Sequence, residues 1–307
     1  MRAFQLVQAQ QPPELREVPV PEPGPGQVLV KVGGAGACHS DLHLMKAPSE
    51  LLGRLPFTLG HENAGWVEKL GPGATGFAPG DPVIVYGPWG CGTCANCRLG
   101  MENYCEATGG LGGGLAGNDG GMAPYLLVPA TRFLIPLGSL DPREAAPLTD
   151  AALTSYHAVK RSLHLLGPGS TAVVIGAGGL GQMAIQILRA LSSSTTVVAV
   201  DTAADKLATA ERMGADEALL SGEDAVTRIK DMTRGQGAQL VLDMVGVDPT
   251  LRMAAQVARV RGHLTIVGLA KLGPTKSVRT SQVWSSRAGS RWRTLLRARS
   301  TAQRQCT

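Results

Sequence analysis

From about residue 151 onward, short apolar strands alternate with helices, and this pattern restricts the possible fold more than any other feature of the chain. The segments TAVVIG, TTVVAVD, EALLS and QLVLDMVG are typical of strands, and GLGQMAIQILRALS and AADKLATAERMG are typical of helices. GHLTIVG, at residues 262–268, is expected to be the fifth strand. This alternation indicates an α/β fold with a parallel, doubly wound sheet.

The segment GAGGLG, residues 176–181, lies between the first of these strands and a helix, and it fits the pattern G-x-G-x-x-G. Gly176 permits a tight turn, Gly178 lets the backbone approach a pyrophosphate, and Gly181 lets helix and strand pack closely. The alternative to a dinucleotide site is an ordinary glycine turn in an unrelated α/β protein. The strand before the glycines and the helix after them favour a dinucleotide site.

The residues around this segment also predict which dinucleotide is bound. The helix that begins near Gly179 and Leu180 offers free N–H groups to phosphates. Asp201 ends the second strand, where a carboxylate can accept hydrogen bonds from the adenosine ribose and would repel a 2′-phosphate. We therefore expect NAD rather than NADP, with Lys206 as a further cofactor-binding residue. The glycine-rich run GGLGGGLAGNDGG, residues 109–121, has no such strand or helix beside it, and we interpret it as a mobile loop.

Residues 1–150 have a different character, with many Gly and Pro residues between short Val-rich runs such as GQVLVKVGGAG and GDPVIVYG. These runs indicate a β-barrel-like domain. Within it lie four cysteines in the pattern C-x2-C-x2-C-x7-C, namely Cys91, Cys94, Cys97 and Cys105. Four thiolates on short loops suit a closed structural Zn²⁺ site. An iron–sulfur cluster, or metal-free buried thiols, are the competing interpretations.

Three more segments carry chemically active residues: GACHSDLH, GHENAG and PLTDAAL. Each residue alone has an ordinary structural explanation. Together, Cys38, His61 and Asp150 offer a thiolate, an imidazole and a carboxylate. Three protein ligands leave one coordination position open, as a catalytic zinc requires.

With these motifs in order, the chain resembles the zinc-containing medium-chain alcohol dehydrogenases. The resemblance rests on Gly60-His61-Glu62-x-x-Gly65, on the four-cysteine segment and on the later glycine fingerprint, and it covers roughly residues 1–270. YGPWGCG and PLTDAALTSYHA look like bacterial NAD-dependent secondary-alcohol dehydrogenases. The resemblance implies a GroES-like catalytic domain at 1–150, with its structural zinc lobe at 91–105, and an NAD-binding Rossmann domain at 151–270.

The resemblance also implies roles for individual residues. Cys38, His61 and Asp150 would hold the catalytic zinc, and Cys91, Cys94, Cys97 and Cys105 the structural zinc, which gives two zinc ions per chain. Glu62 would lie beside the catalytic metal, and Asp41 would orient His61. Ser40 would pass a proton to His43, and His39 would lie near the cofactor pyrophosphate. The reaction implied is reversible hydride transfer between a primary or secondary alcohol and NAD.

Residues 271–307 depart from the family. They hold nine of the 29 Lys and Arg residues and none of the 24 Asp and Glu residues, so the first 270 residues are slightly acidic despite the net charge of +5. We interpret them as a basic tail of the kind that a frameshift produces. The Rossmann sheet would then be incomplete, its fifth strand an exposed edge, and the dimer-forming strand of the homo-oligomeric family missing. A catalytically impaired, truncated zinc-binding fragment is the alternative function.

The remaining features exclude other classes of protein. The acidic body gives no reason to propose a nucleic-acid partner, although the tail alone could bind nucleic acid or acidic membranes. No apolar run reaches the ~18 residues needed to span a bilayer, and the N-terminus MRAFQLVQAQQPPEL has no apolar signal-peptide core. We expect a cytoplasmic enzyme that acts on a small alcohol or carbonyl compound.

Overall fold

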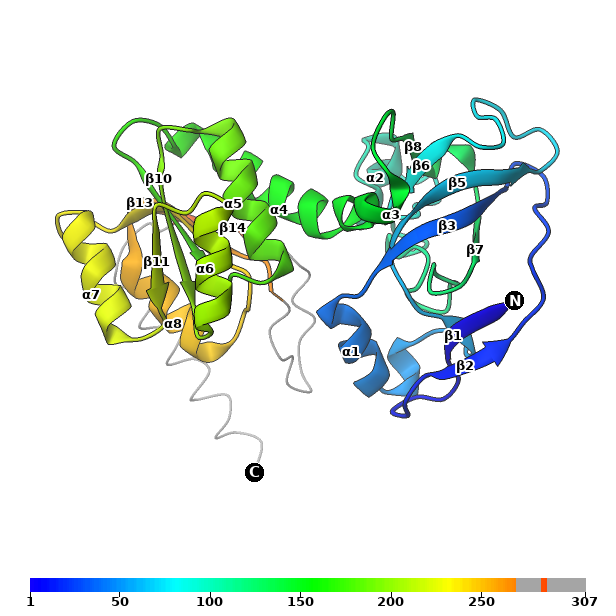
Figure 1. Ribbon diagram of the computed structural model, residues 1–307, viewed down its shortest axis with the longest axis horizontal. Helices are drawn as coiled ribbons and strands as arrows, with labels where there is room; N and C mark the ends of the chain where they lie inside the picture. The colour runs from blue at the N-terminus through cyan, green and yellow to red at the C-terminus, as the bar shows by residue number, and fades with distance from the viewer. Residues whose placement is uncertain (269–282, 286–307) are drawn as a thin grey trace. The chain divides into compact units, whose positions relative to one another are not determined.

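Figure 1 presents a computed structural model, which describes residues 1–268 and 283–285. The chain divides into two compact units, Met1–Asp150 and Ala151–Thr307, called here the N-terminal unit and the C-terminal unit. Except for 283–285, the predicted basic tail at 271–307 lies outside the described residues. None of the helices in the described ranges has both the length and the apolar character that crossing a bilayer requires.

The N-terminal unit is built on two antiparallel sheets, as its Val-rich runs predict. One sheet has the strand order β2-β1-β4, and the other has the order β7-β3-β5-β6-β8. The strands are β1 (Arg2–Leu6), β2 (Glu14–Glu17), β3 (Val28–Gly36), β4 (Phe57–Thr58), β5 (Glu62–Leu70), β6 (Pro82–Val85), β7 (Tyr125–Val128) and β8 (Leu134–Pro136). The helices are α1 (His39–Lys46), α2 (Ala95–Arg98) and α3 (Pro142–Ala145), with 3-10 turns at Ser49–Leu51, Glu102–Tyr104, Thr131–Phe133 and Ala146–Thr149.

Alternation along these strands creates the core of the N-terminal unit. Val28 and Val30 of β3 are fully or almost fully buried, and they pack with Val67 of β5 and with Trp89 and Phe133. Strand β3 pairs with β5 over most of its length, in a register that places Gly36 opposite Glu62. Because β5 begins at Glu62, this pairing fixes the place of the residue before it, His61.

The C-terminal unit is the expected parallel sheet, with the order β11-β10-β9-β12-β13 followed by the antiparallel strand β14. Its strands are β9 (Thr171–Ile175), β10 (Thr196–Asp201), β11 (Glu217–Leu220), β12 (Ala238–Asp243), β13 (Ala258–Ile266) and β14 (Val283–Ser285). Its helices are α4 (Ala151–Lys160), α5 (Gly179–Leu191), α6 (Ala204–Arg212), α7 (Glu223–Met232) and α8 (Asp248–Val257), with a 3-10 turn at Leu163–Leu165.

Helices cover both faces of this sheet (Figure 1), because successive side chains point to opposite faces and a central strand such as β9 is buried along its whole length. Val174 and Ala199 pack with Ile185 and Leu188 of α5 on one face. Val173 and Val198 pack with residues of α7 and α8 on the other, including Ile229. The doubly wound architecture predicted from the sequence is thus confirmed.

Strand β14 corrects one expectation of the sequence analysis. The fifth strand, β13, was expected to be an exposed edge, but Val283–Ser285 pairs antiparallel with His263–Thr265. An unpaired strand edge presents a row of free N–H and C=O groups, and a short segment with Val and Trp residues, which favour strands, can satisfy them.

The glycine-rich run at residues 109–121, called here the glycine strap, corrects a second expectation of the sequence analysis. Seven of its eight glycines are buried, all except Gly109. Gly120 and Gly121 donate backbone hydrogen bonds to Thr58 and Gly60, at 2.8 and 2.9 Å. The expectation of a mobile loop is therefore wrong, because the absence of side chains lets this backbone pack inside the N-terminal unit.

We predict that Gly181→Ala destabilises the C-terminal unit by about 1–3 kcal/mol, because its Cβ would lie 1.9 Å from the carbonyl oxygen of Gly176. Gly179→Ala is the matched control, since a Cβ there meets nothing within 4 Å and alanine favours a helix over glycine. Urea unfolding followed by circular dichroism measures both. Equal stability of the two variants would contradict the close packing of strand and helix.

Candidate active site and metal centres

The N-terminal unit brings together three potential metal ligands that are far apart in the sequence. Cys38 precedes α1, His61 precedes β5, and Asp150 follows the 3-10 turn Ala146–Thr149. Their ligand atoms all lie within 4.8 Å of one another. Oδ2 of Asp150 lies 3.9 Å from Sγ of Cys38 and 3.5 Å from Nε2 of His61.

These separations fit a tetrahedral zinc ion. Zn–S bonds of about 2.3 Å and Zn–N or Zn–O bonds of about 2.0–2.1 Å at tetrahedral angles place the ligand atoms roughly 3.3–3.6 Å apart. The donors also match the thiolate, imidazole and carboxylate chemistry that zinc accepts. The structure contains the donor set of a site with three protein ligands.

Asp41 connects two of these ligands. One carboxylate oxygen accepts a 2.8 Å hydrogen bond from the backbone N–H of Cys38, at the start of α1. The other lies 3.3 Å from Nδ1 of His61, within ion-pair distance. Asp41 is only 3% exposed. Asp41 therefore holds the imidazole at Nδ1, which leaves Nε2 facing the other ligands. This is the orienting role that the family resemblance implies.

The surroundings of His61 stabilise a positive charge. Burial of the ring lowers the pKa of His61, but its contacts with Asp150, Asp41 and Cys38 outweigh this effect and raise the pKa to about 12. A divalent cation held by Cys38, His61 and Asp150 would supply that positive charge and leave the imidazole neutral, as a ligand must be.

Other residues predicted for this site lie close by. Glu62 is buried at the start of β5, and its carboxylate packs against Gly36, where a Cβ would come within 1.9 Å of Oε2. Oγ of Ser40 lies 3.6 Å from Sγ of Cys38. His43 is exposed one helical turn further along α1, and its ring packs edge-on against His39 at 5.3 Å between centroids. The predicted contact of His39 with the cofactor stays a prediction.

The four predicted cysteines form a second cluster, with ligand atoms also within 4.8 Å of one another. Sγ of Cys91 lies 4.0 Å from Sγ of Cys97, close to the roughly 3.8 Å expected for two thiolates on one tetrahedral zinc. The chain wraps the cluster with backbone N–H groups directed at sulfur. Cys91 accepts from Thr93 and Cys94, both at 3.4 Å, and Cys105 accepts from Thr108 at 3.4 Å.

These hydrogen bonds favour thiolates, the form that binds metal. The Thr93 side chain and backbone lower the pKa of Cys91. Hydrogen bonds from the Thr108 side chain and from backbone N–H groups, that of Cys91 first, lower the pKa of Cys105 to about 5. Burial raises the pKa of Cys97 to about 12. A metal ion would offset the cost of ionising the buried Cys97 thiol.

In the C-terminal unit, the predicted fingerprint lies at the carboxyl edge of the sheet. Gly176 has φ +93°, and Gly178 precedes α5 without a capping side chain. Asp201 ends β10 and is 8% exposed. Its Oδ2 accepts a 2.7 Å hydrogen bond from the N–H of Ala177, within the fingerprint, and Oδ1 accepts from Ala203 at 3.0 Å. The remaining lone pairs of the carboxylate are suited to ribose hydroxyls.

Sequence reasoning missed two residues that shape this edge. Asp243, fully buried at the end of β12, accepts hydrogen bonds from the N–H groups of Val245 and Gly246 at 3.0 and 2.9 Å. It thereby fixes the loop whose Val245 packs on Gly176. Ser155 of α4 donates a 2.9 Å hydrogen bond to the carbonyl of Leu180. The sequence held a signal for Asp243 only, an acidic residue at the end of an apolar strand.

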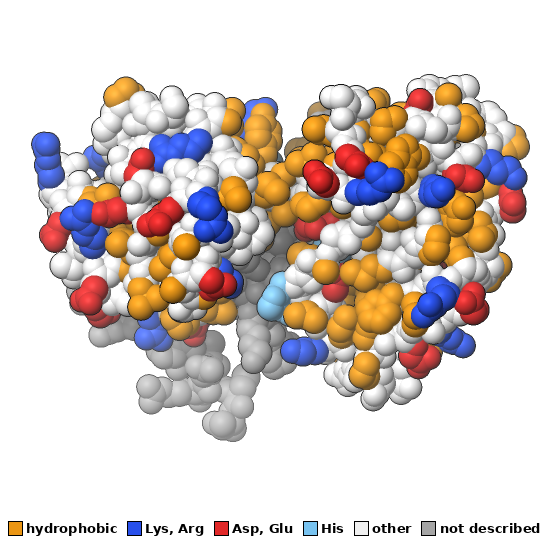
Figure 2. Space-filling view, in the orientation of Figure 1, with side chains coloured by type: hydrophobic (Ala, Val, Ile, Leu, Met, Phe, Trp, Pro, Cys, Tyr) orange, Lys and Arg blue, Asp and Glu red, His pale blue; other side chains and the backbone are white. Residues whose placement is uncertain are grey.

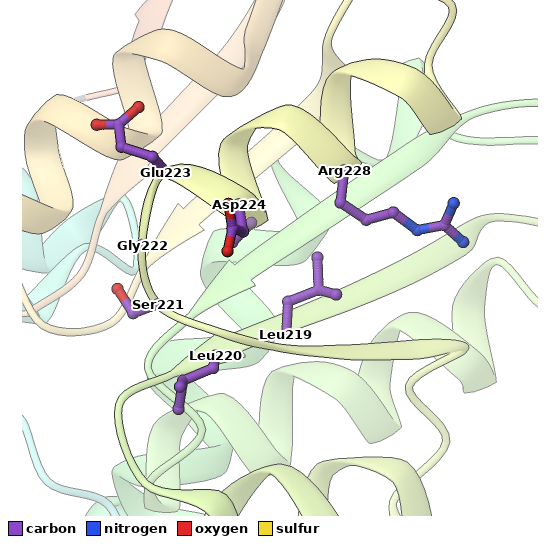
Figure 3. Close-up of a pocket in the computed structure, with 8 residues that line it drawn as sticks. Leu219, Leu220, Ser221, Gly222, Glu223, Asp224 and Arg228 are labelled. Atoms are coloured by element: carbon purple, nitrogen blue, oxygen red, sulfur yellow. The ribbon is translucent and has the colours of Figure 1, made fainter.

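A surface pocket of about 400 Å³ lies beside Asp201, at the end of β11 and the start of α7 (Figure 3). Ser221 on its rim donates a 2.9 Å backbone hydrogen bond to the carbonyl of Asp201. Arg228, the basic residue of the pocket lining, forms an ion pair with Glu217, with 2.9 Å between Nε and Oε1. The predicted cofactor residue Lys206 is exposed on α6.

Comparison with known proteins decides the family. Two family profiles match, an alcohol dehydrogenase GroES-like domain at residues 24–139 and a zinc-binding dehydrogenase at residues 179–297. An NAD-dependent alcohol dehydrogenase of Sulfurisphaera tokodaii is 41% identical over 279 residues, which cover 88% of this chain and 78% of that protein. The chain belongs to the zinc-containing alcohol dehydrogenase family. The second match extends beyond residue 270, to residue 297.

Two further relatives of this family bear on fold and cofactor. A D-arabinose 1-dehydrogenase (NADP(+)) of Saccharolobus solfataricus is 36% identical and is covered to 81%, with 93% of this chain aligned. The crystal structure of the alcohol dehydrogenase of Aeropyrum pernix is 35% identical, with a TM-score of 0.82, and the match covers 93% of this chain and 86% of that one. The zinc-binding description supports zinc over an iron–sulfur cluster.

We predict that Cys105→Ser removes one of two zinc equivalents per chain and lowers the thermal midpoint of the N-terminal unit. The physical reason is that a metal ion would be the centre around which the four thiols of the loop at residues 91–105 are arranged. Zinc analysis after dialysis and differential scanning calorimetry measure the two effects. Thr93→Ala, which removes one hydrogen bond to Cys91 but no ligand, is the control and should keep both equivalents.

Proposed function

We propose that this chain is a zinc-dependent alcohol dehydrogenase that transfers hydride reversibly between a primary or secondary alcohol and NAD. The observation that carries the proposal is the convergence of Cys38, His61 and Asp150 within 4.8 Å. Three protein ligands leave a coordination position for a substrate oxygen. The second chemical requirement, a dinucleotide site, is met by the fingerprint at residues 176–181 with its strand and helix.

The metal and the nicotinamide supply the bond chemistry: zinc when bound lowers the pKa of a coordinated hydroxyl and polarises a carbonyl, and the nicotinamide accepts or gives the hydride. The protein supplies orientation and a route for the proton. Asp41 keeps Nε2 of His61 directed at the metal position by holding Nδ1. The buried Glu62 adds negative charge beside the ligands.

The proton released by an alcohol must reach solvent, and α1 offers the route. Ser40 lies next to Cys38, so its hydroxyl can accept the proton and donate its own onward. His43 is exposed on the same helix. Partial burial, the neighbouring His39 ring and the Lys46 ammonium lower the pKa of His43. The ring is therefore neutral at pH 7 and able to accept a proton.

The geometry favours NAD over NADP. Asp201 places negative charge at the end of β10, where a 2′-phosphate would lie. Arg228 is paired with Glu217 and does not offer an unpaired guanidinium to that phosphate. Because one relative is named for NADP(+), the preference for NAD has to be tested, by comparing the binding of NADH with that of NADPH. The thiolate ligands need a reducing compartment, so we place the enzyme in the cytoplasm.

The decisive experiment is a turnover assay of zinc-loaded full-length protein. NADH absorbance is followed with 2-propanol, 1-phenylethanol and D-arabinose as substrates. Turnover with an alcohol is expected. Zinc-loaded protein that binds NADH yet oxidises none of these compounds would favour the alternative, a zinc-binding fragment without activity.

We predict that Ser40→Ala lowers kcat by about 10²–10⁴-fold, the usual contribution of a positioned proton-transfer group, whereas Ser40→Thr retains most activity. Zinc content and the Kd for NADH should stay unchanged in both. Ser49→Ala, in an exposed 3-10 turn of the same unit, is the matched control. An equal loss in Ser40→Ala and Ser40→Thr would show that packing, and not the hydroxyl, matters.

We predict that activity falls as the pH drops below about 6.5, because a protonated His43 cannot accept the proton and its pKa lies below that value. His43→Gln should lower kcat and remove this acid limb. The pH profile of kcat/KM for both proteins measures it. An unchanged acid limb in the variant would assign the limb to another group.

We predict that the unsubstituted protein binds NADH at least 10-fold more tightly than NADPH, because the Asp201 carboxylate repels a 2′-phosphate. Nicotinamide fluorescence measures both dissociation constants. Asp201→Asn keeps an oxygen for the N–H of Ala177 and should narrow the difference. Equal affinities in the unsubstituted protein would remove the argument for NAD.

A further inference from the structure

The glycine strap, residues 109–121, packs backbone against backbone on the residue that precedes the zinc ligand His61. A Cβ on Gly114 would lie 2.5 Å from the carbonyl oxygen of Gly60, and one on Gly120 would lie 2.2 Å from the same atom. Real Cβ atoms essentially never lie within 3.0 Å of such an atom. Only glycine at these two positions allows the strap to lie where it does.

Hydrogen bonds fix the strap to the same short segment. Gly120 donates to the carbonyl of Thr58 at 2.8 Å, and Gly121 donates to the carbonyl of Gly60 at 2.9 Å. In return, the N–H of Thr58 donates to Oδ1 of Asp119 at 2.8 Å. The strap is thus tied at both sides of residues 58–60, which lead directly into His61.

Residues 58–60 include a backbone conformation that is restricted to glycine-like residues. Gly60 has φ +97°, a left-handed conformation that lets the chain turn just before His61. Its carbonyl accepts a second hydrogen bond, from Nδ2 of the buried Asn63, at 3.0 Å. The direction of the Gly60 peptide therefore depends on the strap on one side and on β5 on the other.

At its other end the strap is fixed to the four-cysteine lobe. Gly109 donates a 2.9 Å hydrogen bond to the carbonyl of Cys105. A Cβ on Gly110 would lie 2.6 Å from the carbonyl oxygen of Glu102, and one on Gly112 would lie 2.0 Å from that of Gly87. The strap forms a continuous packed connection from a structural zinc ligand to the residue before His61.

We propose that the glycine strap is a positioning element for the catalytic metal ligand His61. Its backbone holds the Gly60 peptide, and the peptide holds the imidazole at the place where it meets Cys38 and Asp150. The inference rests on the zinc site proposed above, and it assigns to residues 109–121 a role that their spacing in the sequence does not reveal. Gly114 and Gly120 act through Gly60 and touch neither metal nor substrate.

The test compares Gly114→Ala with Gly109→Ala. Both glycines have left-handed φ angles, +81° and +65°, so both substitutions introduce the same kind of backbone strain. A Cβ on Gly109 meets nothing within 4 Å, whereas one on Gly114 meets Gly60. Cobalt(II) is titrated into metal-free full-length protein, and its visible absorption bands report each thiolate site. Cys38→Ser identifies the bands of the His61 site.

The expected result is that Gly114→Ala binds cobalt about 10–100-fold more weakly at the His61 site, the usual effect of losing a residue that orients a ligand. Gly109→Ala should bind as the unsubstituted protein does. Both should keep the four-cysteine site and the Kd for NADH. Equal affinity in the two variants, whether unchanged or reduced, would overturn the proposal.

A milder variant covers the case in which Gly114→Ala does not fold. Asp119→Ala removes the hydrogen bond to Thr58 without adding an atom, and it should weaken cobalt binding at the His61 site several-fold. Affinity equal to that of the unsubstituted protein would overturn the role of the strap. Absence of the His61-site bands in the unsubstituted protein would instead contradict the zinc site itself.

Discussion

The N-terminal unit depends on holding three ionisable groups, the Cys38 thiol and the carboxyl groups of Asp41 and Asp150, around the buried imidazole of His61. Cys38, His61 and Asp150 come from segments separated by up to 112 residues, and bringing an ionised thiol and a carboxylate together without a cation would cost free energy. Asp41 reduces the cost, because one side chain caps α1 through Cys38 and also faces His61. The metal site and the local fold thus share the same hydrogen bonds, which is why the ligand atoms already lie near tetrahedral spacing.

Close contact between backbones is the second constraint, and it recurs in both units. Gly181 fits against the carbonyl of Gly176 at the dinucleotide edge, and Gly114 and Gly120 fit against Gly60 near the metal ligands. In each case a Cβ would occupy the place of a carbonyl oxygen. Side-chain packing can adjust to small changes in volume, but a peptide group cannot move without moving its neighbours. Sites that need fixed geometry are therefore built where glycine lets two backbones meet.

Much of the fold and of the candidate site could be predicted from the sequence, because apolar periodicity and ligand spacing are local properties. The alternation after residue 151 predicted β9 to β13, and the types of donor at Cys38, His61 and Asp150 predicted a metal centre. The glycine strap was misread because the same glycines suit a mobile loop and a buried one, and only the tertiary partner decides. Strand β14 was missed because its pairing depends on the open edge of β13, which a short isolated run does not reveal.

Charge on the described surface also agrees with a small-molecule enzyme. Acidic and basic side chains are intermixed on the visible faces of both units, and neither shows a single-sign stripe suited to nucleic acid (Figure 2). Two carboxylates, those of Asp201 and Asp243, lie beside the glycine fingerprint, and backbone N–H groups partly neutralise each of them. The N–H groups at the start of α5 have no side-chain cap. The acidic residues shape the loops of this edge of the sheet, and in the function proposed above the N-terminus of α5 would receive the negative charge of the cofactor.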